Sequence, residues 1–320
     1  MTTIRIDPVT RLEGHLDIEV TVEAANGTQQ VVDAHSSGTM FRGFEIILKD
    51  RDPRDATILT QRICGVCPVS HAMASTLNLE CAFGVAPPDN GRILRNLVLG
   101  ANFIMSHVLH FYHLAALDYI DTTGIVDMSP WQPRYVTPDM VSGPTAATLV
   151  GHYVQALEMR RKAHQMGAIF GAKLPCVATF VPGGCTDVVT AEQVADFATL
   201  LSELRSFVDD VYIPDILTVA GAFGGYFNVG AGCGNLLAYG VFDLDAAGMS
   251  KLLAGGRYTD GTAAAFDAGQ IKEYVEHSWY TDACGNLNPS EGETQPQPGK
   301  PDAYSWIKAP RYEDKVHEVG

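Results

Sequence analysis

The chain has 320 residues, 46% of them hydrophobic and 18% charged, and a formal net charge of −15 from 37 acidic and 22 basic residues. This composition is ordinary for a globular protein with a sizeable core. The sequence has an excess of acidic residues and no cluster of basic ones, so nucleic acid and anionic membrane surfaces are poor candidate partners. The seven cysteines are odd in number and include one closely spaced pair, which excludes a disulfide framework.

The first third of the chain begins with strand patterns and then changes period. Alternation predicts strands over residues 4–9 and 16–22, with residues 30–34 returning as a hairpin partner. After Gly43 the pattern favours short helices over residues 44–48 and 53–62. The N-terminus lacks an apolar core followed by a cleavage site, so it is not a signal peptide.

Long helices are predicted for the middle of the chain. Pro68 and Gly84 bracket a helix over 68–83, and further helices are expected over 91–120 and 145–170. In the third of these, Val150, Val154 and Leu157 share one face. Thr190 and Gln193 form a capping-box pattern for a helix that reaches residue 211 and is broken by Pro214.

The stretch 96–117 carries no Asp, Glu, Lys or Arg and needs to be considered as a membrane span. Its asparagine and histidine side chains would be costly in lipid. We therefore expect a buried core helix and no membrane span. The glycines at 230, 232 and 234 lack the full spacing of a dinucleotide fingerprint. The predicted fold is α+β: one unit over 1–320 with a mainly helical core of long buried helices and an N-terminal β-element.

The strongest local signal is the run Arg62-Ile63-Cys64-Gly65-Val66-Cys67-Pro68-Val69-Ser70-His71. Two thiols at this spacing can face one metal, and the intervening glycine would permit a tight turn. A helix starting at Pro68 would favour a thiolate at Cys67. Taken alone, the pair fits a metal site, a redox dithiol or plain buried cysteines about equally well.

Further motifs extend this signal along the chain, and together they resemble the large, metal-carrying subunit of nickel–iron hydrogenases. The matching runs are Arg11-Leu12-Glu13-Gly14-His15, Arg42-Gly43-Phe44-Glu45, Arg51-Asp52-Pro53-Arg54-Asp55, the cysteine run, His110-Phe111-Tyr112-His113-Leu114 and Lys308-Ala309-Pro310-Arg311-Tyr312. Ser106 and the histidines that follow it are most similar to the selenium-containing branch.

The resemblance implies a nickel and an iron bridged by cysteine sulfurs, with Cys64 a terminal nickel ligand and Cys67 a bridging one. The iron would carry carbon monoxide and cyanide ligands. Dihydrogen would be cleaved heterolytically, and electrons would pass to iron–sulfur clusters in a separate small subunit. Soft thiolates suit both metals.

The resemblance assigns roles to Glu13 and Glu45, and position in the chain suggests roles for His71, Val66 and Leu114. Glu13 would relay protons, although a Glu paired with Arg11 or capping the hairpin is the plainer alternative. Glu45 would bind a separate magnesium or iron ion, unless it is a helix-surface carboxylate. His71, one turn after Cys67, would hydrogen-bond a cysteine sulfur or be a core histidine. Val66 and Leu114 would border the path of dihydrogen.

One departure from the family is large: its second cysteine pair, near the C-terminus of members, is absent. Cys284 is the last cysteine. We therefore expect an N-terminal portion whose partners are the remaining C-terminal part and the small subunit. Localisation would be periplasmic or membrane-associated through the partner's signal, with cytoplasmic as the alternative. Competing functions are a non-catalytic respiratory-complex subunit and a dithiol or zinc protein.

Overall fold

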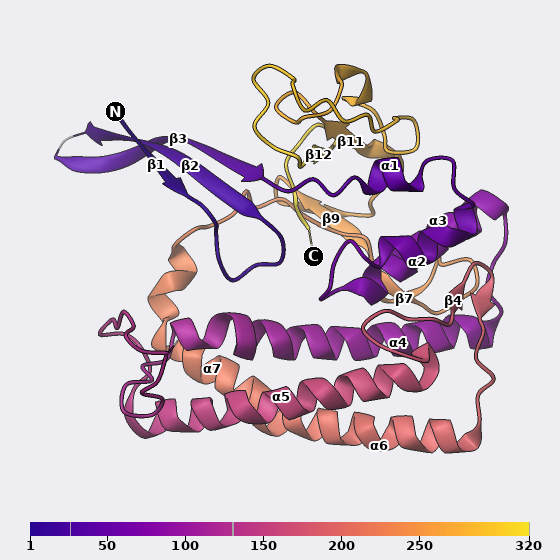
Figure 1. The fold of residues 1–320 in the computed structure, drawn as a ribbon, viewed down its shortest axis with the longest axis horizontal. Coiled ribbons are helices and arrows are strands. Elements are labelled where there is room, and N and C mark those ends of the chain that lie inside the picture. Colours follow the sequence, from indigo (N-terminus) through magenta and orange to yellow (C-terminus); the bar gives the residue numbers. More distant parts are fainter. Residues whose placement is uncertain (26, 130, 320) are drawn as a thin grey trace. The chain divides into compact units, whose positions relative to one another are not determined.

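Contacts between residues divide the chain into two units in the computed structural model, which describes residues 1–25, 27–129 and 131–319. The first unit comprises Met1–Arg51, Gly232–Phe242 and Lys251–Gly320, and the second comprises Asp52–Ala231 and Asp243–Ser250. Sheets dominate the first unit and helices the second (Figure 1). The predicted mixture of helix and sheet is therefore confirmed.

The N-terminal β-element of the first unit is an antiparallel sheet. Its strands are β1 (Thr2–Ile6), β2 (Leu16–Ala25) and β3 (Thr28–Gly38), in the order β1-β2-β3. The predicted first strand reached Val9, whereas β1 stops at Ile6. Pro8 has no N–H to donate to a sheet, which explains the earlier end. The buried carboxylate of Asp17 on β2 accepts a hydrogen bond from Arg5 on β1, at 2.6 Å.

The remainder of the first unit contains short strands that the sequence did not predict, together with helix α1 (Phe44–Leu48), which it did. Runs of two to four residues are too short to show alternation. One sheet has the order β10-β9-β6-β13, and β11 pairs with β12. The bounds are β6 (Leu236–Ala238), β9 (Gly256–Thr259), β10 (Thr262–Ala264), β11 (Ile271–Tyr274), β12 (Ala309–Tyr312) and β13 (Glu318–Val319). A further pair is β7 (Val241–Asp243) with β8 (Lys251–Leu253).

The second unit is built on helices that lie side by side. In Figure 1, α4, α5 and α6 run next to one another, and α4 packs on α5 and α5 on α6. Their bounds, with those of the other helices and of one small hairpin, are α2 (Ala56–Thr60), α3 (Pro68–Phe83), α4 (Asp89–Val108), α5 (Gly143–Gly171), α6 (Ala191–Phe207), α7 (Ile213–Ala222), β4 (Phe180–Val181) and β5 (Gly184–Cys185).

The buried face of α5 differs from the apolar face picked out by periodicity. Val154 and Leu157 are 60% and 50% exposed, whereas Ala156 and Ala163 are fully buried. Gly167 is also buried, and a Cβ there would meet Ala101 of α4 at 3.2 Å. The buried face also carries Leu149, Met166 and Phe170, so it mixes small and large residues, while Val154 and Leu157 remain at the surface.

Pro214 does not break the helix that precedes it, so that prediction is wrong. A π-helical turn, Val208–Tyr212, follows α6, and α7 begins directly after it with proline in its first turn. The proline therefore lies where the hydrogen-bonding pattern changes from π- to α-helical. The capping box at Thr190 and Gln193 is present as predicted.

Helix α4 also continues into a π-helical segment, Leu109–Ala115, and a 3₁₀ turn. The combined stretch Asp89–Asp118 is long and apolar enough to cross a membrane by length and composition alone. Buried Val98, Met105 and Val108, and a fully buried Arg95, lie along α4. Of the most apolar stretch of this helix, 39% is buried inside the structure.

Candidate metal centre

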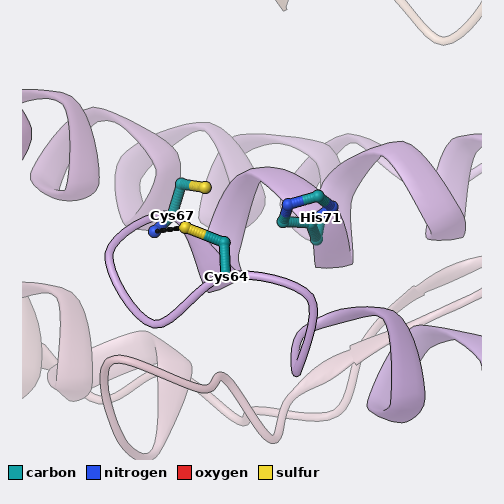
Figure 2. A group of neighbouring side chains, drawn as sticks. All are labelled: Cys64, Cys67 and His71. Atoms are coloured by element: carbon teal, nitrogen blue, oxygen red, sulfur yellow. Dashed lines mark hydrogen bonds between the residues drawn. The ribbon is translucent and has the colours of Figure 1, made fainter. Parts of the chain in front are cut away.

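The side chains of Cys64, Cys67 and His71 converge at the start of α3. One ligand atom from each lies within 4.8 Å of the others (Figure 2). Among the described residues, no other group of three or more His, Cys, Asp or Glu meets the same geometric test. The cysteine motif that stood out in the sequence is therefore also the strongest candidate metal centre in the structure.

Local hydrogen bonds give the cysteine loop its shape. The sulfur of Cys64 accepts backbone N–H groups from Val66 at 3.3 Å and from Cys67 at 3.1 Å. Cys67 is the N-cap of α3, and its carbonyl accepts the N–H of His71 at 3.3 Å. The loop therefore turns around one sulfur and enters the helix at the second cysteine, which brings the imidazole one turn later to the same side.

Gly65 does not have the conformational role that the sequence suggested. Its φ is not in the left-handed region, and a Cβ built on it would meet nothing within 4 Å. The two N–H groups bonded to Cys64 make the turn, and these do not require glycine.

Burial and the helix N-terminus set the electrostatics of the cluster. Cys64 is 6% exposed, while Cys67 and His71 are half-buried. Burial lowers the pKa of His71, so its ring is neutral at pH 7 and carries one N–H and one lone pair. Cys67 lies at the N-terminus of α3, where the helix dipole favours negative charge. Two thiolates and an imidazole are a donor set that fits nickel or iron.

A buried ion pair anchors the far end of α3. Arg95 of α4 donates to the carboxylate of Glu80 at 2.7 Å, and the two side chains are only 2% and 7% exposed. The same guanidinium donates to the carbonyls of Val181 and Gly184, and Glu80 also accepts the N–H of Gly183. Helix α3, helix α4 and the β4–β5 hairpin are thus tied at one point. Nothing in the sequence indicated this pair, because its members belong to different helices.

The other predicted site residues lie in different surroundings. Glu13 is exposed in a bend between β1 and β2, and Glu45 is exposed in the first turn of α1; both belong to the first unit. Within that unit, burial, followed by the charges of Glu45 and Glu273, raises the pKa of Tyr280 to about 12. In the second unit, Val66 is part of the cysteine loop, and half-buried Leu114 lies on the π-helical segment after α4.

Sequence reasoning missed one buried polar network. Tyr112 donates to Asp215 at 2.6 Å, and the Nδ1 of His152 lies 2.8 Å from the same carboxylate. Burial, followed by the hydrogen bond to Asp215, raises the pKa of Tyr112 far above its usual value. The three residues come from the π-helical segment, α7 and α5. Their side chains pin these helices together, and no sequence spacing could have paired them.

The comparisons with known proteins agree with this picture. The family model described as nickel-dependent hydrogenase matches residues 42–136 and 126–320, and a model described as HoxL-like matches residues 3–36. The periplasmic NiFeSe hydrogenase large subunit of Desulfomicrobium baculatum is 47% identical, over 99% of this chain and 62% of that protein. The uptake hydrogenase large subunit of Rhizobium leguminosarum bv. viciae is 33% identical, over 99% and 66%.

Solved structures give the same result. The NiFeSe hydrogenase from D. vulgaris Hildenborough in the reduced state superposes with a TM-score of 0.93 at 47% identity, covering 100% of this chain and 65% of that one. The similarity to the selenium-containing proteins exceeds that to the uptake enzyme, as the sequence predicted. The chain spans a little under two thirds of the length of these relatives, and it belongs to the nickel-dependent hydrogenase family.

Proposed function

We propose that this chain supplies part of the catalytic centre of a hydrogenase that cleaves dihydrogen reversibly. The observation that carries the proposal is the convergence of Cys64, Cys67 and His71 within 4.8 Å at a helix N-terminus. The long helices α4 and α5 belong to the same unit as this loop. The presence of both thiols argues against a non-catalytic respiratory-complex subunit. The match to the hydrogenase family argues against a dithiol or zinc protein.

The two cysteines would hold nickel and iron, with Cys64 as a terminal nickel ligand and Cys67 as a bridge. When bound, the metal pair, whose iron also carries carbon monoxide and cyanide, supplies the Lewis acidity and electron storage that heterolytic cleavage needs. Neutral His71 would donate its N–H to a cysteine sulfur and fix the charge on it. The cluster offers two thiolates, so the remaining ligands must come from outside it.

The two glutamates of the first unit would serve proton transfer and a second ion. Glu13 would accept the proton released by cleavage and pass it on, as a positioned carboxyl can. Its exposed bend agrees with contact to water. Glu45 would contribute an oxygen to a magnesium or iron ion, a hard cation that prefers carboxylates.

Val66 and Leu114 would border the route of dihydrogen to the metals. Both are apolar and half-buried. Replacing either with Met should narrow the route and slow inhibition by carbon monoxide, measured as the rate of activity loss on gas addition. Inhibition at the parent rate in both variants would remove them from the route.

Electrons would leave through iron–sulfur clusters of a small subunit. The relative from Desulfomicrobium baculatum is named a periplasmic large subunit, which supports the same compartment and a partner subunit here. Export would depend on the partner's signal.

The proposed function is tested by replacing each thiol in the enzyme assembled with its partner subunit. Cys64→Ser and Cys67→Ser should each lower nickel content and reduce dihydrogen uptake more than about 100-fold. That loss is larger than the loss expected from replacing a residue that only hydrogen-bonds a ligand. Cys81→Ser, at an exposed cysteine of α3, is the matched control and should behave like the parent. Full nickel and full activity in either test variant would refute the metal site.

A further inference from the structure

The buried network of Tyr112, Asp215 and His152 has no part in the proposed metal chemistry. Tyr112 is 1% exposed and Asp215 5%, whereas His152 is only partly buried. Asp215 accepts the phenolic O–H of Tyr112 at 2.6 Å, and the Nδ1 of His152 lies 2.8 and 3.0 Å from its two oxygens. An ionised carboxylate only accepts hydrogen bonds, so His152 donates from Nδ1, and two donors hold the charge of Asp215 in place.

Tyr112 differs from the other buried tyrosines in the charge that lies beside it. Among the described residues, the others are Tyr280 and Tyr312. Lys308 and Arg257, respectively, place cations over their rings, each 5.7 Å from the ring centroid. A cation over a ring opposes removal of an electron from it, whereas a buried carboxylate at hydrogen-bond distance favours that removal. Of the three, Tyr112 is therefore the one whose surroundings favour one-electron oxidation.

The phenolic proton of Tyr112 also has a base beside it. Burial, followed by the hydrogen bond to Asp215, raises the pKa of Tyr112, so the phenol keeps its proton until an electron is removed. An oxidised phenol is a strong acid, and the carboxylate of Asp215 is placed to accept its proton. The neighbouring ring of Tyr212, 6.0 Å away between centroids, provides a contrast. Its hydroxyl donates to the carbonyl of His107, which is a much weaker base.

We propose that Tyr112 is a redox-active tyrosine, the position in the second unit at which an oxidising equivalent comes to rest. A peroxyl radical accepts one electron from the phenol and becomes a hydroperoxide anion. The phenolic O–H bond breaks and its proton passes to Asp215, which leaves a neutral tyrosyl radical beside a neutral carboxylic acid. His152, hydrogen-bonded to the same group and partly exposed, connects it with water. None of these steps involves the metal centre.

Capture of the oxidising equivalent protects the apolar cluster around Tyr112. Val108 and Phe207 are among the residues that bury its ring, and half-buried Met159 packs against the same cluster. Oxidation of the Met159 thioether would convert an apolar side chain into a polar sulfoxide among these residues. A tyrosyl radical, in contrast, returns to tyrosine by taking one electron from a thiolate, which becomes a thiyl radical, and the proton held on Asp215.

Photo-oxidation of the assembled enzyme tests the site, with flash-generated tris(bipyridyl)ruthenium(III) as the oxidant and EPR as the readout. The parent should give a long-lived neutral tyrosyl radical. This radical should form more slowly in deuterated water, because the proton and the electron leave together. Tyr112→Phe should lose the radical, whereas Tyr212→Phe, the matched control on the neighbouring ring, should keep it. Absence of the radical from the parent, its persistence in Tyr112→Phe or its loss in Tyr212→Phe would overturn the proposal.

Replacement of the base gives the second measurement. Asp215→Asn keeps an oxygen that accepts from Tyr112 but cannot take its proton, so the long-lived radical should be lost although the tyrosine remains. Thermal unfolding checks that this variant is folded, and the two tyrosine variants decide the matter if it is not. Under peroxyl radicals from a thermal azo initiator, Met159 sulfoxide, measured by mass spectrometry, should rise in Tyr112→Phe and stay at the parent level in Tyr212→Phe. A folded Asp215→Asn that forms the radical, or equal sulfoxide in Tyr112→Phe and the parent, would reject the redox role.

Discussion

The cysteine loop and the bend at residues 11–15 both carry family motifs, yet the chain builds them very differently. In the loop, Cys64 is buried and Cys67 half-buried, the Cys64 sulfur accepts two backbone N–H groups, and a helix starts after Cys67. In the bend, Arg11 and Gly14 have φ values of 66° and 104°, and Glu13 is exposed. Neighbouring residues alone therefore set the geometry of the cysteine loop. The bend, in contrast, leaves the side chain of Glu13 exposed.

The roles proposed for the two motifs would account for this difference. A metal ligand must be held before the metal arrives, because ordering it afterwards would weaken binding. A proton relay must release its proton to water as well as accept it, which an enclosed carboxylate does poorly. The loop should therefore be sensitive to the packing beneath it, and the bend to its chemistry and backbone conformation.

The largest expected effect comes from the support of the loop. Glu80→Gln leaves the buried guanidinium of Arg95 without its counter-charge, so the free energy of unfolding should fall by about 3–5 kcal/mol. Chemical denaturation of the variant and the parent measures this change. Nickel content of the assembled variant should fall in parallel, since Glu80 lies on α3 and Cys67 is the N-cap of that helix.

The exposed pair Glu158–Arg161 on α5 provides the control for Glu80. Glu158→Gln removes an ion pair of the same chemistry from the surface and should leave unfolding unchanged. Equal effects at the two positions would show that the buried pair does not support the loop.

The bend is tested through Glu13. Glu13→Gln keeps the shape of the side chain but cannot carry a proton, so turnover should fall about 10²-fold while nickel content stays at the parent level. Conversion of para- to ortho-dihydrogen needs only cleavage and should be retained, whereas isotope exchange with solvent should be lost. Exchange at the parent rate would make Glu13 structural.

The sequence predicted the features that depend on neighbouring residues and missed those that depend on contacts between distant segments. Helix α3 has the predicted ends because Pro68 and Gly84 act on their immediate neighbours, and Gly84 adopts the expected left-handed conformation. The grouping of Cys64, Cys67 and His71 is equally local, since all three lie within two helical turns. These features could be derived from the sequence alone.

The missed features depend on contacts between distant segments. The Glu80–Arg95 pair and the Tyr112–Asp215 hydrogen bond join residues 15 and 103 positions apart. The helix through Pro214 continues because a π-helical turn precedes it, and proline alone gives no sign of such a turn. The face of α5 was misjudged because its buried residues include alanine and glycine, such as Ala156 and Gly167, which a search for large apolar residues passes over.

A smaller effect is expected at the glycine of the bend. Gly14 has a φ of 104°, which side-chain-bearing residues rarely adopt, and a Cβ there would meet no atom within 4 Å. Gly14→Ala should therefore lower the free energy of unfolding by about 1–3 kcal/mol through backbone strain alone. Chemical denaturation measures the change, and no loss of stability would mean that the bend relaxes to another conformation.

The smallest effect is expected at Gly65, which tests whether the cysteine loop depends on glycine. Its backbone is not in the left-handed region, and the Cβ position is open. Alanine also reduces the conformational freedom of the unfolded chain. Gly65→Ala should therefore raise the free energy of unfolding, by less than about 1 kcal/mol. The comparison with Gly14→Ala by the same denaturation experiment isolates backbone conformation, because both positions lack neighbours that would clash. If Gly65→Ala destabilised the chain as much as Gly14→Ala, the loop would be strained, and its ligand geometry could not be attributed to the two N–H groups bonded to Cys64.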